Sequence, residues 1–425
     1  MPGGLIQLVA IGAQDVVLTS QPEITFFSAL YRPYVNFAIE SIANNFTGAP
    51  DFGTDVNFDV SRSGDLITNV LLEAVLPAVE VTGQNPTFQW ACKIGNTMIE
   101  EVSVDIGGTI IDKQFGQFYN IWNELTLPEE KRKGYNLMVG QQNLKYNKTD
   151  PADIVVYEDG LQTPLPNQPQ YVVQVPLFFW FCNNSGLALP LIALQYHTVK
   201  FNFRFRPFNQ LHRVTGTDVS FVGGTPRLGT TKVYIDYIYV DNMERKNFAQ
   251  APHEYLITQL QRYERTVNGQ TEAINLTFNH PTKELIWIVQ EDVAIRANDW
   301  CNWEVVNPVN AGVSAGDNPL TDAILRLNSN DRFSVRRGEY FNLVQPYYHH
   351  SRIPESKGIF VYSFALNPEE FQPGGTVNFS RIDNTELRLN LKNITTSNPG
   401  KVTVYAINYN LLRVANGMAG IAYAS

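Results

Sequence analysis

Polar and apolar residues alternate along much of the chain, in short runs separated by turn-forming residues. In the run 201–206, Phe201, Phe203 and Phe205 would share one face of an extended segment, and the polar residues would share the other. A period of two residues is typical of a β-strand with one buried face. Strands are therefore expected in both halves of the chain, with further alternating runs at 56–60, 102–106, 233–240, 386–392 and 402–409.

Two segments depart from this alternation. The run 285–289 contains no polar residue, which predicts a strand that is buried on both faces. Residues 114–125 carry Phe118 and Trp122 at helical spacing, which predicts a short accessory helix over one end of a β-sandwich. Many alternating strands with few helices favour an all-β fold made of β-sandwiches over an alternating α/β fold.

The length of the chain predicts more than one domain. Its 425 residues exceed the roughly 250–300 residues that one hydrophobic core usually organises. The polar segment 241–247 directly follows an expected strand and is the best boundary. We therefore expect an N-terminal arm at 1–25, a first β-domain at 26–243 and a second at 244–425.

The composition points away from nucleic-acid binding. The net charge is −9, whereas binding to phosphates requires a net or local excess of Lys and Arg. The basic run 131–133 directly follows Glu129 and Glu130, so we interpret it as a solvated loop or helix face. The hydrophobic fraction of 44% and the charged fraction of 17% suit large cores and a surface that is neutral enough to bind partners. No direct contact with nucleic acid is expected.

Neither a membrane span nor a disulfide is expected. Residues 160–199 contain no charged side chain, but five prolines interrupt them, so no run approaches the ~20 apolar residues of a span. The N-terminus does not have the pattern of a signal peptide, and a soluble protein is expected.

Cys92, Cys182 and Cys301 lie far apart in the sequence, which favours reduced, partly buried thiols in a cytosolic setting.

The search for catalytic and metal-binding motifs finds no convincing site. His253 and Glu254 lack a second histidine at the spacing of a zinc-protease helix. His349 and His350 are adjacent, so a turn or a surface pair is expected. Ser314 lies in a G-x-S-x-G pattern, but prolines on both sides oppose the strand–turn–helix that this motif needs. We therefore expect no catalytic residue, no cofactor, no metal ligand and no enzyme activity.

Three stretches resemble the major capsid proteins of large icosahedral double-stranded DNA viruses of the nucleocytoplasmic group, most closely those of algal viruses, the phycodnaviruses. They include GGLIQLVA at 3–10, GLALPLIALQYH at 186–197 and NFSRIDN at 378–384. Such motifs span nearly the whole chain in order. One departure is the pair Gly374-Gly375, where the family commonly has Ser-Gly.

The resemblance implies a fold and a function. The expected fold is a double jelly roll, two consecutive eight-stranded β-sandwiches with a few short helices in loops. The expected function is that of a structural subunit whose pseudo-hexagonal homotrimers tile the shell around an inner membrane and a DNA genome. Neighbouring capsomers, minor capsid proteins and penton proteins are the implied partners, and the host cytoplasm is the implied place of assembly. Without the resemblance, a carbohydrate-binding β-sandwich would explain the same patterns equally well.

Overall fold

The computed structural model describes residues 3–141, 143–146, 154–158, 166–306 and 316–423. Contacts divide the chain into two units, Met1–Asn36 and Phe37–Ser425. The described side chains of the N-terminal unit are all exposed. This unit has two short helices, α1 (Gly3–Val9) and α2 (Ala13–Thr19).

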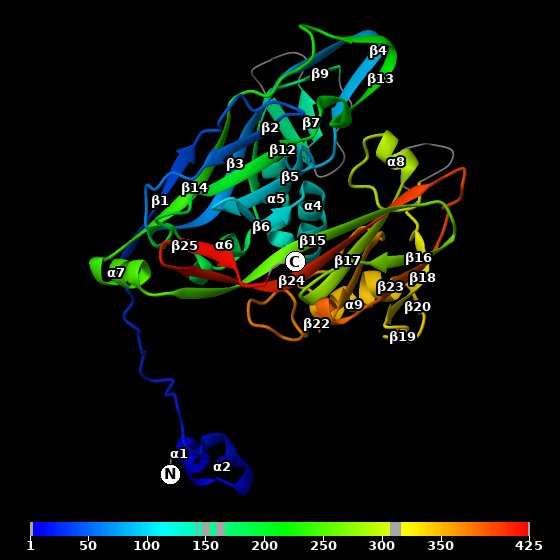
Figure 1. The fold of residues 1–425 in the computed structure, drawn as a ribbon. Coiled ribbons are helices and arrows are strands. Elements are labelled where there is room, and N and C mark those ends of the chain that lie inside the picture. The colour runs from blue at the N-terminus through cyan, green and yellow to red at the C-terminus, as the bar shows by residue number, and fades with distance from the viewer. Residues whose placement is uncertain (1–2, 142, 147–153, 159–165, 307–315, 424–425) are drawn as a thin grey trace. The chain divides into compact units, whose positions relative to one another are not determined.

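The first half of the large unit is a β-sandwich, referred to below as the first lobe (Figure 1). One sheet has the strand order β1 (Phe37–Asn44), β14 (Thr231–Val240), β3 (Leu66–Leu76) and β10 (Tyr171–Pro176), and β11 (Leu189–Pro190) also pairs with β3. The other sheet has the order β2 (Asp55–Asp59), β12 (Val199–Phe205), β5 (Ile99–Ile106) and β6 (Thr109–Gln114). Further strands of this half are β13 (His212–Phe221), β4 (Val79–Trp90) and β9 (Asn167–Gln168), which form one ribbon, and the pair β7 (Asn143–Tyr146) and β8 (Ile154–Glu158).

The second half repeats this arrangement and is the second lobe. One sheet has the order β15 (His253–Val267), β24 (Gly400–Ala415), β17 (Pro281–Glu291) and β21 (Ile359–Ser363), extended by β22 (Val377–Asn378) and β25 (Met418–Ile421). The other has the order β16 (Thr271–Leu276), β23 (Thr385–Leu391), β18 (Leu320–Leu327) and β19 (Asn330–Asp331), with β20 (Arg336–Arg337) on β18.

Both lobes are jelly rolls. In each lobe the first strand pairs with the last long strand, and each of the two sheets has a main path of four antiparallel strands. Two packed sheets with this Greek-key order define a jelly roll. The all-β double jelly roll expected from the sequence is therefore confirmed.

The alternating patterns became strands for the expected reason. In β12, Phe201, Phe203 and Phe205 are buried, and the residues between them are more exposed. Phe201 and Phe203 pack on Phe58 of the paired strand β2, with ring centroids 5.3 and 6.3 Å away. Aromatic rows of this kind hold the core of the first lobe together.

Short helices fill the connections. The longest are α4 (Gly116–Thr126) and α5 (Glu129–Val139), both between β6 and β10. The basic run 131–133 lies on α5, where Lys131 and Lys133 are exposed, as a helix face requires. The other helical segments are α3 (Ile94–Thr97), α6 (Trp180–Asn183), η1 (Ser185–Leu187), η2 (Leu191–Ala193), η3 (Phe208–Gln210), α7 (Asn242–Gln250), α8 (Asp292–Arg296), η4 (Tyr340–Val344), α9 (Gln345–His349) and η5 (Phe379–Arg381).

Candidate functional site

The two lobes meet at a buried junction, formed by one sheet of the second lobe. Residues of β17 alternate between two hydrophobic cores. Leu285, Trp287 and Val289 belong to the core of the second lobe. Ile286 and Ile288 belong to the core that continues into the first lobe. The prediction that 285–289 is buried on both faces is confirmed, and the reason is that the junction covers the outer face of this sheet.

Helix α4 of the first lobe lies in this junction. The ring of Phe118 lies 5.3 Å from that of Tyr405 on β24, and the hydroxyl of Tyr405 donates a hydrogen bond to Gln117 Oε1. Close packing at the start of the helix depends on Gly116, since a Cβ there would lie 1.9 Å from the carbonyl oxygen of Asn96. The expected helix at 114–125 is confirmed as α4, and it also contacts the second lobe. The helical spacing of apolar residues in 114–125 could not by itself reveal that a second lobe covers the helix.

A hydrogen-bonded carboxyl group also joins the lobes. Asp112 on β6 accepts a hydrogen bond from the backbone N–H of Leu260 on β15 at 3.0 Å and another from the side chain of Gln114 at 3.1 Å. Burial raises the pKa of Asp112 to about 7, although these hydrogen bonds oppose the shift. The side chain of Gln259 donates a further bond across the junction, to the carbonyl oxygen of Ile111.

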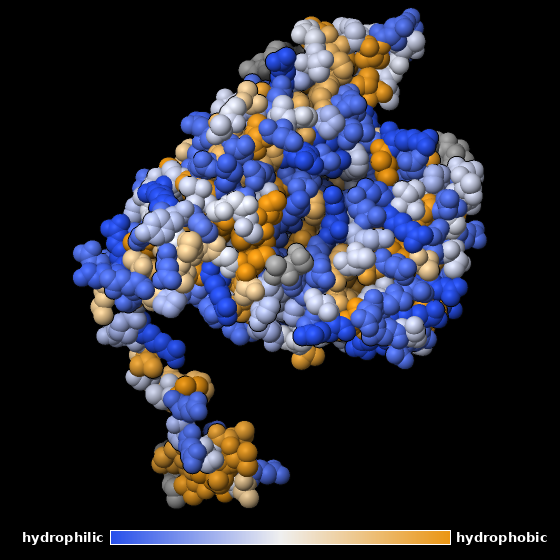
Figure 2. All heavy atoms as spheres, in the orientation of Figure 1, coloured by the Kyte–Doolittle hydropathy of each residue, from blue (hydrophilic) through white to orange (hydrophobic). Residues whose placement is uncertain are grey.

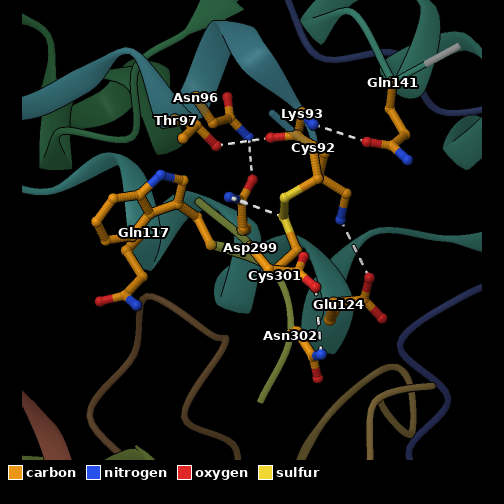
Figure 3. Close-up of a disulfide and its surroundings, with 12 residues drawn as sticks. Cys92, Lys93, Asn96, Thr97, Gln117, Glu124, Gln141, Asp299, Cys301 and Asn302 are labelled. Atoms are coloured by element: carbon orange, nitrogen blue, oxygen red, sulfur yellow. Dashed lines mark hydrogen bonds and ion pairs between the residues drawn. A yellow bond between two sulfur atoms is a disulfide. The ribbon is translucent and has the colours of Figure 1, made fainter. Parts of the chain in front are cut away.

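A disulfide links Cys92 of the first lobe to Cys301 of the second, with a Cα–Cα distance of 6.2 Å (Figure 3). The expectation of three reduced thiols was therefore wrong for these two. They are 209 residues apart in the sequence, and only the docking of the lobes brings them together. Cys182 is a free thiol, and burial raises its pKa to about 12.

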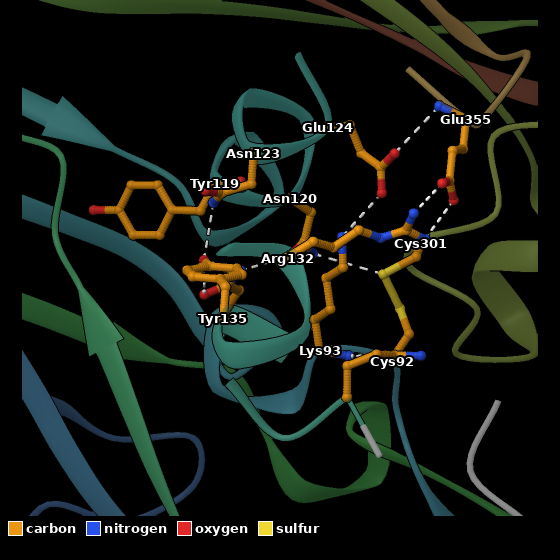
Figure 4. Close-up of polar contacts among 12 residues, drawn as sticks. Cys92, Lys93, Tyr119, Asn120, Asn123, Glu124, Arg132, Tyr135, Cys301 and Glu355 are labelled. Atoms are coloured by element: carbon orange, nitrogen blue, oxygen red, sulfur yellow. Dashed lines mark hydrogen bonds and ion pairs between the residues drawn. A yellow bond between two sulfur atoms is a disulfide. The ribbon is translucent and has the colours of Figure 1, made fainter. Parts of the chain in front are cut away.

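Polar side chains surround the disulfide (Figure 4). Lys93 and Glu124 form a mostly buried ion pair at 3.1 Å, and Asn120 donates to Cys301 Sγ at 3.7 Å. Arg132 of α5 forms an ion pair with Glu355 of the second lobe. A charged pair therefore links the two lobes at the junction, in addition to the disulfide.

His350 belongs to a buried charge cluster. Its Nε2 lies 3.0 Å from Glu284 and its Nδ1 lies 3.0 Å from Glu369, and the imidazole is fully buried. Burial alone lowers the pKa of the imidazole, but the two carboxylates outweigh burial and raise the pKa to about 9. The expectation of a surface pair was therefore wrong for His350. A two-residue motif says nothing of Glu284, which is 66 positions away.

His253 and His349 each bond to a backbone carbonyl oxygen. His253 Nε2 donates to the carbonyl oxygen of Phe248 at 2.9 Å. No cluster of three or more potential metal ligands occurs within the described ranges. Ser314 lies outside the described residues.

A cavity of about 460 Å³ lies between the lobes. Its lining combines aromatic side chains with ionisable groups, including Phe118, Trp122, Asp112, Lys283 and Glu369. Lys283 Nζ donates to the carbonyl oxygen of Pro368, and burial lowers the pKa of this amine. The cavity and the disulfide therefore both lie at the junction of the lobes, and ionisable side chains line the cavity.

Apolar side chains are also exposed at several places. In the N-terminal unit they include Leu8, Val17, Leu18 and Phe27, and Figure 2 shows apolar residues gathered there. On the second lobe, Tyr347 and Tyr348 are each 69% exposed, and Leu366 is 75% exposed. Exposed apolar groups of this extent indicate surfaces that bind partners.

Comparisons with known proteins assign the family. Residues 25–241 match the model described as "Major capsid protein N-terminus", and residues 244–420 match "Large eukaryotic DNA virus major capsid protein". The chain is 42% identical to the major capsid protein of Pyramimonas orientalis virus and 38% identical to that of Paramecium bursaria Chlorella virus 1, over the full length of each.

Solved structures agree with this assignment. The capsid protein of Paramecium bursaria Chlorella virus 1 superposes with a TM-score of 0.77 at 34% identity, covering 94% of this chain and 100% of that one. The Faustovirus major capsid protein has the same fold, with a TM-score of 0.80 at 14% identity, covering 95% of this chain and 94% of that one. With its two jelly rolls and two matching family models, the chain belongs to the major capsid proteins of large eukaryotic DNA viruses.

Proposed function

We propose that this capsid protein assembles into homotrimeric, pseudo-hexagonal capsomers. The observation that carries the proposal is the repetition of one jelly roll within the chain, with the same sheet order in both lobes. Three copies of two similar lobes approximate sixfold symmetry, so such a trimer would tile a flat facet hexagonally. The buried junction supports this role, because a subunit of a regular lattice must hold its two lobes in a constant relative position.

The chain divides in this proposal into an arm at 1–25, a first jelly roll at 26–243 and a second at 244–425. The arm would face the inside of the shell. Its exposed apolar residues would then be available to minor capsid proteins, penton proteins or neighbouring capsomers. The proposal places the protein in the virion, around an inner membrane and a DNA genome, after assembly in the host cytoplasm.

The proposed role requires neither catalysis, nor a cofactor, nor direct binding to the genome. The net charge of −9 opposes contact with DNA phosphates. Among the described residues, no helix is long and apolar enough to cross a membrane. Family membership decides in favour of the capsid subunit over the carbohydrate-binding alternative.

The molar mass in solution tests this proposal. Light scattering of the purified chain, at several concentrations and with a chelator present, should give about 144 kDa, three times the 47.9 kDa of the monomer. Electron micrographs should show particles with a six-lobed outline. A mass of one chain at every concentration would contradict the proposal.

A further inference from the structure

A helix of the second lobe is apolar on the side that faces solvent. It runs through η4 and α9. Its inner side is secured within the lobe, where the amides of Asn342 and Gln345 bond to the backbone of Ile359 and Ser363. A surface helix normally has a polar outer side, and a helix that is apolar all round is normally buried. Here the outer side consists of Leu343, Val344, Tyr347 and Tyr348, which are 44%, 38%, 69% and 69% exposed.

Helix α4 has the equivalent place in the first lobe, and there it is covered. It follows β6, the end strand of one sheet, and precedes β10, the end strand of the other. The exposed helix likewise follows the strands paired with β18 and precedes the end strand β21. Within the chain, α4 packs on the outer face of the β15-β24-β17-β21 sheet through Phe118 and Tyr405.

The first lobe has a sheet face of matching design. In the covered sheet, Tyr405 on the last long strand pairs with Ile286, which pairs with Val361. In the β1-β14-β3-β10 sheet, a row of the same kind runs across the corresponding strands. Tyr234 on β14 pairs with Leu71, which pairs with Pro176 on β10. In both rows, the last long strand of the lobe contributes a tyrosine, and the next two strands of the sheet each contribute an apolar residue.

Among the described residues of Phe37–Ser425, the edges of this second face are exposed. Ile39 at one edge is 54% exposed and Val172 at the other is 45% exposed, while Leu71 and Tyr234 between them are partly exposed. We call this surface the open face. Its apolar members are Ile39, Leu71, Val172, Tyr234 and Ile238, and the charged residues Glu73, Lys232 and Asp236 lie between them on the same side of the sheet. The described part of Phe37–Ser425 thus carries one exposed helix and one partly exposed sheet face, which resemble the two halves of the contact that its junction already makes.

We propose that the exposed helix of one copy packs on the open face of the next copy, with Tyr347 and Tyr348 against Tyr234. The contact repeats between chains the junction that α4 makes within the chain. It joins two different surfaces, so it is head-to-tail, and such contacts produce a closed ring when the rotation between copies closes. This inference rests on the proposed trimer, whose subunit contacts it assigns to named residues.

Charge substitutions on either surface test the contact. Tyr348→Glu and Tyr234→Glu should each convert the 144 kDa species to a monomer of 47.9 kDa, because each replaces an aromatic contact with a carboxylate that must be desolvated in the interface. Tyr196→Glu is the matched control, since Tyr196 is 76% exposed but belongs to neither surface, and this variant should remain a trimer. Circular dichroism and the melting temperature show whether each monomer is folded.

Cross-linking provides a test that does not depend on loss of assembly. In a Cys182→Ser background, the double variant Tyr348→Cys/Tyr234→Cys treated with a short bismaleimide should run as a covalent trimer on denaturing gels. Either cysteine alone should give no cross-linked trimer. If the wild-type chain is a trimer, but the Glu variants stay trimeric or the double variant does not cross-link, the contact is wrong while the trimer stands. If the wild-type chain is a monomer, both proposals fail.

Discussion

His350 and Glu284 form a buried pair in which Nε2 and Oε2 are 3.0 Å apart and neither side chain is exposed. The pair lies beside α4, with the imidazole 6.1 Å from the ring of Trp122. Glu369 contacts the other ring nitrogen, so one imidazolium is held between two carboxylates. The stability of this region should therefore depend on the charge of one histidine.

We expect the protein to lose stability in mild alkali. The pKa of His350 is raised from 6.5 to about 9 in the folded state, so its stabilisation is complete below pH 6.5 and is lost as the pH rises through 9. A shift of this size corresponds to about 3 kcal/mol. The measurement is the free energy of unfolding in urea between pH 6 and pH 10, for wild type and His350→Gln.

The variant should be less stable at pH 7, because it leaves Glu284 buried without its cation. Its stability should also vary less between pH 6.5 and 9 than that of the wild type. His349→Gln is the control, because the imidazole of His349 bonds to the carbonyl oxygen of Leu366 and not to a carboxylate. Parallel pH curves for wild type and His350→Gln would refute the assignment.

Removal of the disulfide should weaken the docking of the lobes. The link closes a loop of 209 residues, for which the loss of chain entropy in the unfolded state predicts a stabilisation of about 5 kcal/mol at most. The double variant Cys92→Ser/Cys301→Ser should melt several degrees lower than the wild type. Reductant should lower the melting temperature of the wild type to a similar extent and leave the variant unchanged.

Cys182→Ser serves as the control for the disulfide experiment. Cys182 is a free thiol, so its replacement should not remove the response to reductant. A wild-type protein that ignores reductant, while its two thiols react fully with alkylating reagents under native conditions, would show that the bond does not form.

Two glycine substitutions should change stability in opposite directions. Gly116→Ala forces a Cβ to within 1.9 Å of the carbonyl oxygen of Asn96, which must displace α4 and should cost about 1–3 kcal/mol or more. Gly134→Ala lies on the exposed side of α5 with no atom within 4 Å of the new Cβ, and should stabilise the helix by about 0.5–1 kcal/mol. Urea unfolding measures both, and equal effects would contradict the packing described for α4.

Deletion of residues 2–20 should leave trimer formation intact but weaken the assembly of trimers into a lattice. The described part of this segment has no buried residue and belongs to the N-terminal unit, so the lobes should fold without it. Light scattering should still detect trimers, while electron microscopy should show fewer extended lattices. Loss of the trimer would instead make the arm part of the subunit contact.

The alternating residues by themselves determined the strands. The faces of β12 follow directly from the spacing of Phe201, Phe203 and Phe205, because burial of one face requires a period of two. The apolar run 285–289 likewise predicted burial on both faces. Long motifs in order also sufficed to indicate the family, since each motif is local in the sequence.

Tertiary structure alone decided the junction. Cys92 meets Cys301, and α4 meets β24, only after the two lobes have folded and docked. His350 meets Glu284 only after the second lobe has folded. No local pattern encodes these pairs, because the partners are separated by tens to hundreds of residues and their side-chain types are compatible with many other positions. Local spacing thus specifies which face of a segment is buried, whereas the identity of what covers that face depends on how the whole chain packs.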